Sequence, residues 1–481
     1  MIRIQNIPLP VGGSLEQLRR KAARTLGLRP GALKQVRLVR QSIDARKKQD
    51  VHYVYTLDVE VEQEEAVLSA CTARNVSLVH PVPYAFPEVK RRSTNMPVVA
   101  GMGPAGLFAA LFLARNGLPC IVLERGQDVD TRTKDVERFW KDGALDPSSN
   151  VQFGEGGAGT FSDGKLTTGT HDPRIAAVMD ALIEAGAPED VKWSHKPHIG
   201  TDILRQVVKT IRQELISLGC DVRFGSCLTG LEHSGGQLSG IWVEGPEGRY
   251  RLDCDALVLA PGHSARDTFR MLEQEGVPME QKSFAIGVRI EHKQKLISQA
   301  QYGPFWDQLP PTDYKLACHL PNGRSAFTFC VCPGGHVVAS ASEPGQLVTN
   351  GMSYRSRDGE NINGGFLVGV GPEDFQTFGA DPLAGVRFQE QWERAAFQEG
   401  GGGFMAPAQR VEDFLAKRAS QGPGEVRPTY QPGVTWTALE DCLPDYVTDT
   451  LRGALPVLDR KLHGFARASC RAPPGIHAPY L

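Results

Sequence analysis

The stretch "PVVAGMGPAGLFAALFLARNGLPCIVLERG", residues 97–126, decides the fold class of this chain. Its first apolar run, residues 98–100, suits a strand that is buried on both faces. A glycine turn of pattern G-x-G-x-x-G follows, and apolar residues then recur at helical spacing up to residue 114. A second apolar run, residues 120–123, predicts another buried strand. The stretch therefore predicts a strand–turn–helix–strand unit of the doubly wound α/β class.

The glycine turn has the chemistry of a dinucleotide-binding loop. Its first glycine makes the tight turn, the second lets a pyrophosphate approach the backbone, and the third lets helix and strand pack closely. The helix N-terminus offers N–H donors to phosphates, and Glu124 lies where an acidic residue accepts hydrogen bonds from a ribose. A purely structural glycine turn would leave Glu124 unexplained. The predicted cofactor-binding residues of this unit are Gly101, Gly103, Pro104, Ala105, Gly106, Glu124 and Arg125.

A second match to the same pattern lies in "NVQFGEGGAGTFSDGK", residues 150–165, but it lacks the flanking elements. No apolar strand precedes it, and turn residues rather than a helix follow it. We therefore predict that its backbone presses against a flat ligand and donates N–H groups to it. A flexible glycine hinge is the alternative. The residues predicted to contact a cofactor here are Gly156, Gly157, Ala158, Gly159, Thr160 and Lys165.

Composition describes a globular protein of 481 residues, with 41% hydrophobic and 22% charged residues. The net charge of −2 hides an asymmetry, because residues 1–92 carry 16 Lys and Arg against 9 Asp and Glu, a net charge of +7. The ten cysteines form no Cys-x-x-Cys pair, which favours reduced thiols and a cytoplasmic protein. The first residues do not read as a signal peptide. The uncharged run 96–114 is explained by the strand, turn and helix, so we expect no membrane span.

Four segments follow from the pattern of strands, helices and prolines. Residues 1–92 show the order βαββαβ, which predicts a ferredoxin-like α+β domain. Residues 93–283 form the first part of a nucleotide-binding domain, in which a strand ends at Ala260-Pro261-Gly262. Residues 284–430 are rich in strands and predict an inserted substrate domain. Residues 431–481 are predicted to return to the nucleotide-binding domain.

Several of these motifs carry a resemblance to a known family. Residues 97–126 and the strand ending at Gly262 resemble the FAD-binding domain of glutathione-reductase-like flavoproteins. The stretches 41–61, 150–166, 259–269 ("LAPGHSARDTF") and 327–340 ("FTFCVCPGGHVVAS") are more closely similar to uncharacterised FAD-dependent dehydrogenases of bacteria and plastids. The resemblance extends to about residue 465. It implies one FAD held by both glycine loops, with further contacts at Leu228, Ala260, Pro261 and Gly262.

The sequence offers three candidate catalytic residues. Lys165 closes the second glycine loop and would place a positive charge near the flavin, although a solvated turn lysine explains it equally well. His263 and Arg266 follow the Pro261-Gly262 turn at the carboxyl end of a strand, where open α/β sheets bind ligands. Arg266 could instead cap a helix. His195 and His198 have no third ligand nearby, so we predict no metal site.

These observations favour an FAD-dependent oxidoreductase that acts on a small organic substrate, with NAD(P)H as a transient reductant. One alternative is an RNA-associated flavoprotein that uses the basic first domain, in which Tyr53 and Tyr55 would stack on bases. Against this alternative, the first strand lacks an aromatic residue and much of the charge lies on a helix, so we expect no nucleic-acid partner. Another alternative is an FAD-binding protein with weak or no catalysis. The sequence carries no signal of an oligomeric state.

The last sixteen residues, "ARASCRAPPGIHAPYL", do not continue the family pattern. They contain three prolines, and they show no apolar strand and no glycine turn with an acid. We therefore expect a truncated or frame-shifted end, an incomplete flavin pocket and weakly bound FAD. The alternative is a natural variant in which another segment closes the site.

Overall fold

The computed structural model describes residues 1–80, 84–88, 95–466 and 475–480. The chain divides into two compact units. Unit 1 contains residues 1–86, 165–199 and 298–312, and unit 2 contains residues 87–164, 200–297 and 313–481. The predicted boundary at residue 92 lies outside the described residues. The predicted first domain thus shares its unit with two later segments, which the sequence had assigned elsewhere.

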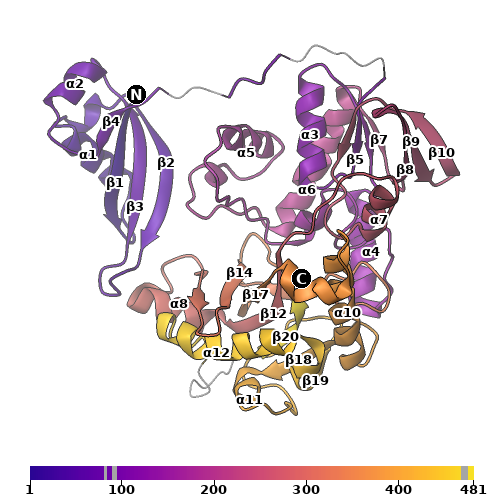
Figure 1. The fold of residues 1–481 in the computed structure, drawn as a ribbon. Helices are drawn as coiled ribbons and strands as arrows, with labels where there is room; N and C mark the ends of the chain where they lie inside the picture. Colours follow the sequence, from indigo (N-terminus) through magenta and orange to yellow (C-terminus); the bar gives the residue numbers. More distant parts are fainter. Residues whose placement is uncertain (81–83, 89–94, 467–474, 481) are drawn as a thin grey trace. The chain divides into compact units, whose positions relative to one another are not determined.

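Unit 1 is built on a four-stranded antiparallel sheet of order β2-β3-β1-β4, with two helices on one face (Figure 1). The first helix begins with a capping box, in which Ser14 and Gln17 exchange side-chain and backbone hydrogen bonds. The order of elements is the ferredoxin-like βαββαβ order that the sequence predicts. The elements are β1 (Ile2–Pro10), α1 (Leu15–Thr25), η1 (Pro30–Ala32), β2 (Gln35–Asp44), β3 (His52–Glu60), α2 (Glu64–Ala70) and β4 (Val76–Leu78).

The alternation of β3 decides which of its side chains are buried. Leu57 and Val59 are buried in the core beneath the helices, and Tyr55 belongs to the same core. Tyr53 packs against this core, and the Tyr55 hydroxyl accepts a hydrogen bond from Gln41 at 2.8 Å. The two tyrosines therefore do not lie on the open face of the sheet, where stacking on bases would require them. This placement removes the observation that had favoured an RNA-binding module.

The later segments of unit 1 add three short helices and one longer helix. The backbone of Trp193–His195 pairs with the outer edge of β2 around Gln41. This pairing covers a sheet edge that would otherwise expose unpaired backbone groups. The helices of these segments are α5 (Arg174–Glu184), η3 (Glu189–Lys192), α8 (Gln294–Tyr302), which crosses the unit boundary, and η4 (Gly303–Phe305).

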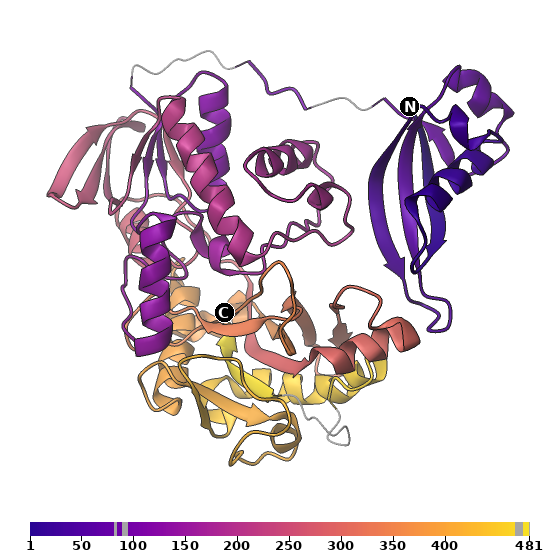
Figure 2. The ribbon, with the colours of Figure 1, turned by 180° about the vertical axis from the view of Figure 1, so that it is seen from behind.

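Unit 2 begins with a parallel sheet of order β11-β5-β6-β7, as the glycine motif predicts. Helices α3 and α6 lie side by side against it (Figures 1 and 2), and an antiparallel sheet of order β10-β9-β8 shares its core with β5 and β6. The elements are β5 (Val98–Ala100), α3 (Pro104–Arg115), β6 (Ile121–Leu123), α4 (Val129–Asp142), η2 (Gly157–Phe161), α6 (Thr201–Ser217), β7 (Asp221–Arg223), β8 (Cys227–Ser234), β9 (Gln237–Gly245), β10 (Gly248–Asp253), β11 (Leu257–Leu259) and α7 (Arg266–Gln274).

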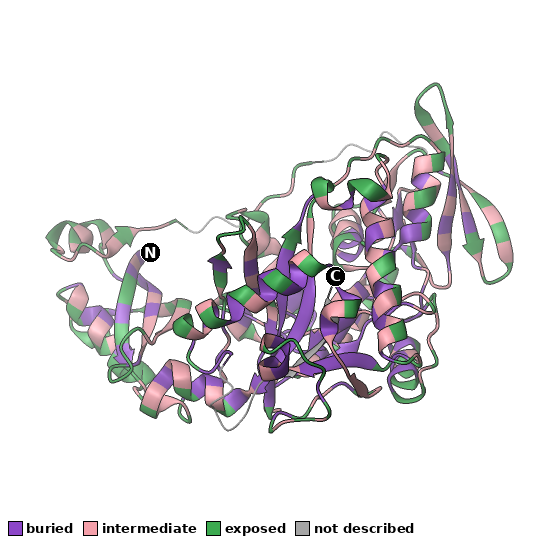
Figure 3. Cartoon of the chain, turned by 60° about the horizontal axis from the view of Figure 1, so that its bottom comes forward, coloured by how far each residue is buried: buried purple, intermediate pink, exposed green. Residues whose placement is uncertain are grey.

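A seven-stranded sheet of order β13-β14-β17-β12-β20-β18-β19 forms the rest of unit 2. Strands β12 and β17 are buried along almost their whole length, and Figure 3 shows strands of the chain coloured as buried. A separate pair, β15-β16, lies beside this sheet. The elements are β12 (Phe284–Lys293), β13 (Ala317–His319), β14 (Ser325–Cys332), β15 (His336–Ala339), β16 (Thr349–Met352), β17 (Asn361–Val370), α9 (Pro372–Phe375), η5 (Gln376–Phe378), α10 (Ala384–Glu399), β18 (Ala406–Arg410), α11 (Val411–Leu415), β19 (Val434–Trp436), η6 (Leu439–Cys442), α12 (Asp445–Lys461) and β20 (Gly475–Tyr480).

The last elements differ from the sequence-based expectation. Residues 431–481 were predicted to return to the parallel sheet, but β19 pairs with β18, and β20 pairs with β12 and β18. Helix α12 contacts β12, β13, β14 and β17 of the same sheet. The expectation that the last sixteen residues contain no strand is also wrong, because residues 475–480 are extended and paired on both sides. Residues 467–474 and 481 lie outside the described residues.

Among the described residues, no helix is long and apolar enough to cross a membrane. The uncharged run that includes α3 is divided by the glycine turn, and α3 itself has 12 residues.

The alternation of β3 generates a test with adjacent residues. Substituting Leu57→Ala removes buried methyl groups beneath α1, so we expect a destabilisation of about 2–5 kcal/mol. Thr56→Ala changes the half-buried neighbour on the opposite face and should cost less than about 1 kcal/mol. Hydrogen exchange of the β1–β3 amides in the full chain measures both. Equal effects of the two substitutions would contradict the assigned faces.

Candidate functional site

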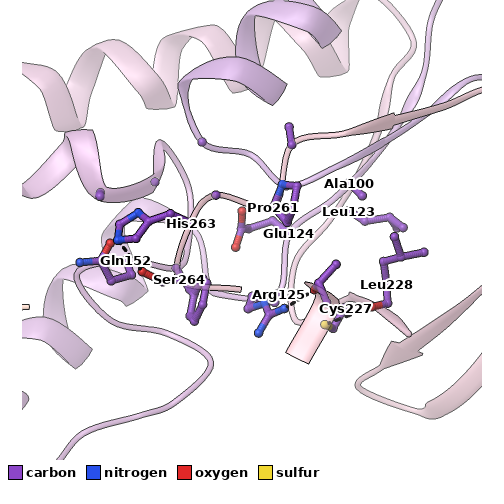
Figure 4. Close-up of a pocket in the computed structure, with 18 of the residues that line it drawn as sticks. Ala100, Leu123, Glu124, Arg125, Gln152, Cys227, Leu228, Pro261, His263 and Ser264 are labelled. Atoms are coloured by element: carbon purple, nitrogen blue, oxygen red, sulfur yellow. Dashed lines mark hydrogen bonds between the residues drawn. The ribbon is translucent and has the colours of Figure 1, made fainter. Parts of the chain in front are cut away.

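A cavity of about 280 Å³ lies at the carboxyl ends of β5, β6 and β11, the edge at which open parallel sheets bind ligands. Figure 4 shows its two ends, with Gln152, His263 and Ser264 at one and Cys227 and Leu228 at the other. The lining residues are Ala100, Gly101, Gly103, Pro104, Leu123, Glu124, Arg125, Gln152, Phe153, Gly157, Ala158, Gly159, Ser226, Cys227, Leu228, Ala260, Pro261, Gly262, His263, Ser264 and Thr268.

The two glycine loops form one wall of this cavity, because they pack backbone against backbone. A Cβ atom at Gly157 would lie 2.8 Å from the Cα of Gly103, and a Cβ at Gly126, in the turn between β6 and α4, would lie 2.6 Å from the Cα of Gly154. The Gly156 N–H donates to the Met102 carbonyl at 2.9 Å. Gly157 also has a φ of +60°, which favours glycine. Close contact of this kind is possible only without side chains.

The Glu124 carboxylate ties these loops together. One of its oxygens accepts the Met102 N–H at 2.8 Å, and the other accepts the N–H groups of Gly126 and Gly154, each at 2.9 Å. The side chain is buried and lines the cavity. Glu124 therefore has a structural role that the sequence did not predict, in addition to the predicted position beside a ribose.

Arg132 of α4 holds the second glycine loop in place through hydrogen bonds to its backbone. Its guanidinium is fully buried and donates to four carbonyl groups of residues 150–157, at distances of 2.6–3.0 Å. It also lies over the Phe161 ring, 4.9 Å from the centroid. Burial lowers the pKa of Arg132 to about 10, so the group stays charged at neutral pH. The sequence signal is its spacing, since Arg132 lies on the same helical face as Val129 and Val136.

Arg125 closes the cavity on the side of β6. Its guanidinium makes two hydrogen bonds to Asp267, at 2.9 and 3.0 Å, and one to the Thr268 hydroxyl at 2.9 Å. It also lies 4.4 Å from the centroid of the Phe153 ring. These contacts fix the guanidinium between α7 and the second glycine loop.

The start of α3 faces the cavity without a side-chain cap. Its N-cap residue is Gly103, and Pro104 occupies the first turn, where it needs no N–H partner. The backbone N–H groups that follow are the donors that helix N-termini offer to anions.

The end of the cavity at His263 is polar, and His263 itself is exposed. The Ser264 hydroxyl lies 3.3 Å from Nε2 of His263, and Gln152 donates to the Ser340 carbonyl at 3.1 Å. Partial desolvation by the surrounding cavity atoms, followed by the nearby charge of Arg266, lowers the pKa of His263 below its usual 6.5, although part of the side chain stays open to solvent. A second, water-sized cavity of about 10 Å³ shares Gln152, His263 and Ser264 with the first.

Arg266, a predicted catalytic candidate, does not line the larger cavity. It is the first residue of α7, and its buried guanidinium makes two hydrogen bonds to Glu393, at 2.5 and 2.9 Å, and one to Gln346 at 2.8 Å. Because the ion pair occupies the guanidinium, Arg266 is better described as a positioning residue that attaches the 261–266 turn to α10.

Most of the predicted cofactor-binding residues come together around the one cavity. Four others support the wall without lining it, since Ala105 and Gly106 lie within α3, and Gly156 and Thr160 lie within the second loop. A Cβ at Gly106 would lie 1.8 Å from the Gly101 carbonyl oxygen, which confirms its predicted packing role. Lys165 belongs to unit 1, where its backbone pairs with His198. The lining residues that sequence reasoning missed are Ala100, Leu123, Gln152, Phe153, Ser226, Cys227 and Thr268.

His195, Cys330 and Cys332, from the histidine and cysteine motifs, do not line the larger cavity. His195 Nδ1 lies 2.7 Å from the guanidinium of Arg40. In the part of the chain that the structure describes, no group of three or more His, Cys, Asp or Glu residues could hold a metal ion. A bulge interrupts β14 between Phe329 and Cys332, so Cys330 and Cys332 do not follow simple strand alternation.

This fold and cavity define a flavoprotein, and comparison with known families agrees. Residues 97–195 match the model of an FAD binding domain, and residues 283–471 match one described as FAD-dependent protein, C-terminal domain-like. Residues 1–60 match a domain of unknown function. The second match spans residue 430, and so joins segments that the sequence analysis had separated. FAD is therefore the cofactor of this protein.

A protein of Clostridium beijerinckii, described as an uncharacterized protein, is 46% identical over 474 residues, which cover 97% of this chain and 87% of the relative. The chain belongs to the family of that protein. The narrower glutathione-reductase-like assignment stays a prediction.

Solved structures resemble the chain only in part. OxyS anhydrotetracycline hydroxylase from Streptomyces rimosus is 19% identical, with 58% of this chain and 47% of that chain covered and a TM-score of 0.28. The flavin-dependent brominase Bmp2 is 13% identical, with 61% of this chain and 60% of that chain covered and a TM-score of 0.32. A flavoprotein/dehydrogenase from Cytophaga hutchinsonii is 14% identical, with 61% of this chain and 60% of that chain covered and a TM-score of 0.29. The chain thus spans less than two thirds of each of these proteins.

The residues of the cavity fit FAD. Glycine positions keep its wall open, since a Cβ at Gly262 would meet nothing within 4 Å and one at Gly103 only Gly157, at 3.8 Å. The α3 N-terminus and the 157–159 backbone would hold the pyrophosphate. Glu124 would face a ribose, and Leu228 and Cys227 would face the adenine.

The contact between the glycine loops can be tested by adding one methyl group. Gly157→Ala places a Cβ against Gly103 at a positive φ, so we expect the purified protein to lose FAD. Gly369→Ala is the matched control, because a Cβ at Gly369 meets nothing within 4 Å. The ratio of flavin to protein after gel filtration measures the effect. Full retention of FAD by Gly157→Ala would contradict the packing.

The role of Arg132 can be tested by keeping its charge. Arg132→Lys cannot reach four carbonyl groups at once, so we expect a loss of about 2 kcal/mol or more and weaker FAD binding. Arg138→Lys changes an exposed arginine of the same helix and should alter stability by less than about 0.5 kcal/mol. Urea unfolding and FAD titration of both variants check this. Similar behaviour of the two would contradict the assigned role.

Proposed function

We propose that this protein is a cytoplasmic dehydrogenase or reductase that moves hydride between FAD and a small organic substrate. The observation that carries the proposal is the polar end of the FAD cavity, where His263, Ser264 and Gln152 meet. When bound there, the flavin supplies the hydride chemistry. The protein contributes binding, orientation and the movement of a proton.

His263 is the candidate for that proton movement. Because its pKa is lowered, the imidazole is neutral at neutral pH and can accept a proton on a ring nitrogen. Oxidation of an alcohol or amine carbon by hydride loss releases one proton from the neighbouring oxygen or nitrogen. A neutral imidazole at this end of the cavity would take that proton, and in the reverse direction it would return it.

The second glycine loop supports a single dinucleotide site, since it helps to build the same cavity as the first. Among the described residues, the parallel sheet β11-β5-β6-β7 carries one strand–glycine turn–helix unit of the fingerprint type. NAD(P)H, if it is the reductant, would therefore bind transiently at the exposed face of the flavin, where the organic substrate also binds. Such an arrangement gives alternating binding of reductant and substrate.

The role of His263 is tested by rapid mixing of the FAD-loaded protein with NADH, NADPH and a set of alcohols and amines. We expect one of these compounds to bleach the flavin, and His263→Gln to slow the bleaching about a hundredfold while FAD is retained. Protonation of His263 removes the base, so the wild-type rate should fall as the pH drops through a value below 6.5. This acid limb should be absent from His263→Gln.

His233→Gln is the matched control, since His233 lies exposed on β8. It should leave both the rate and the pH profile unchanged. If every compound leaves the flavin oxidised, the dehydrogenase assignment fails. If His263→Gln keeps the wild-type rate and acid limb, another group moves the proton.

A further inference from the structure

The open face of the sheet in unit 1, opposite α1 and α2, carries a groove that shares no lining residue with the FAD cavity. Its volume is about 560 Å³, and an adjoining hollow of about 550 Å³ shares five of its residues. The lining residues are Arg3, Gln5, Asn6, Val39, Arg40, Ser42, Val54, Thr56, Lys192, Trp193, Ser194 and His195.

Two β-bulges shape the floor of the groove at the same level of β3. On β1 the register shifts between Ile4 and Ile7, and on β2 it shifts between Leu38 and Arg40. Both shifts lie beside Thr56, where Asn6 takes a positive φ of 54°. Bulges re-aim side chains and are over-represented next to functional sites. Here they bring Asn6, Val39 and Arg40 to the groove.

The segment that joins the edge of β2 supplies one wall. The Gln41 N–H donates to the Trp193 carbonyl at 2.7 Å, and the His195 N–H donates to the Gln41 carbonyl at 2.9 Å. These bonds fix the positions of Trp193 and His195 beside β2. The wall therefore belongs to the sheet and is not a loose loop.

The lining of the larger groove is cationic and contains no carboxylate. Arg3 is balanced by Asp58 of β3 at 2.7 Å, and Lys192 is balanced by Asp180 at 2.6 Å. Arg40 is exposed, and among the described residues it forms no ion pair. The positive charge of Arg40 is therefore available to a ligand in the groove.

The contact between Arg40 and His195 sets the donors of this wall. A guanidinium can only donate, so in this contact Nδ1 of His195 is the acceptor. This bond uses one of the five N–H donors of Arg40 and holds its planar group in place. Hydroxyl groups of Ser42 and Thr56 lie in the same lining. Such a set of donors suits phosphate or carboxylate oxygens.

We propose that this groove is a binding site for a small anionic metabolite that carries phosphate or carboxylate groups. Arg40, positioned by His195, is the principal contact for the anion. The volume falls in the range of pockets that hold nucleotide-sized molecules, and Trp193 offers an aromatic surface to the uncharged part. The site is independent of the proposed hydride transfer.

The test uses the full chain saturated with FAD, so that the flavin occupies the other phosphate-binding loops. Calorimetric titration with inorganic pyrophosphate and, separately, with citrate distinguishes phosphate from carboxylate as the preferred group. We expect at least one of the two to bind the wild type, and Arg40→Gln to weaken that binding about tenfold because one charge-assisted contact is lost. Thr56→Val should weaken it by a smaller factor.

Arg24→Gln is the matched control, since it removes one exposed positive charge from α1, on the opposite face of the sheet. It should leave the affinity unchanged. Absence of binding of both anions to the wild type overturns the proposal. Equal weakening by Arg24→Gln and Arg40→Gln also overturns it, because that result indicates non-specific attraction to a basic domain.

Discussion

The contact between the two glycine loops is the interaction on which the rest of unit 2 depends. A Cβ at Gly157 would collide with the backbone of Gly103, and one at Gly126, in the turn after β6, would collide with the backbone of Gly154. Backbone groups brought this close need hydrogen-bond partners, and Glu124 supplies them to three N–H groups. Arg132 supplies the carbonyl groups of the second loop with donors. Two buried side chains of opposite charge thus hold one wall.

The same wall is connected to β15, to the loop before β17 and to α10. Trp140 of α4 donates to the Ala339 carbonyl at 2.9 Å, and Asp163 of the second loop forms an ion pair with Arg357 at 2.5 Å. The ion pair of Arg266 with Glu393 makes a third connection. Buried ion pairs add little net stability, but they disfavour alternative packings because a broken pair leaves a buried charge. The contact with Glu393 lies at the polar end of the cavity, since Glu393 and Arg266 line the small cavity beside His263.

The four-stranded sheet of unit 1 has one apolar face and one polar face. Apolar residues of β1 and β3 pack beneath α1 and α2, whereas the opposite face carries arginine, amide and hydroxyl groups. Because strand side chains alternate, a one-residue bulge changes which residues reach each face. The bulges at Asn6 and Val39 could not be inferred from the sequence, since neither position is a glycine. Trp193 and His195 join this face from a distant part of the chain.

The sequence by itself determined the strand–turn–helix unit at residues 97–126 and the ferredoxin-like order of residues 1–92, whereas the convergence of both glycine loops with Leu228 and Pro261 was implied only by the family resemblance. The first two features depend on local chemistry, such as glycine geometry and apolar periodicity, which neighbouring residues reveal. Only the tertiary structure decided that Glu124 bridges three backbone segments, that Arg266 pairs with Glu393 and that β19, α12 and β20 belong to the seven-stranded sheet. The physical reason is that a buried charge and a strand edge each take the partner that satisfies them, and that partner lies far away in the chain.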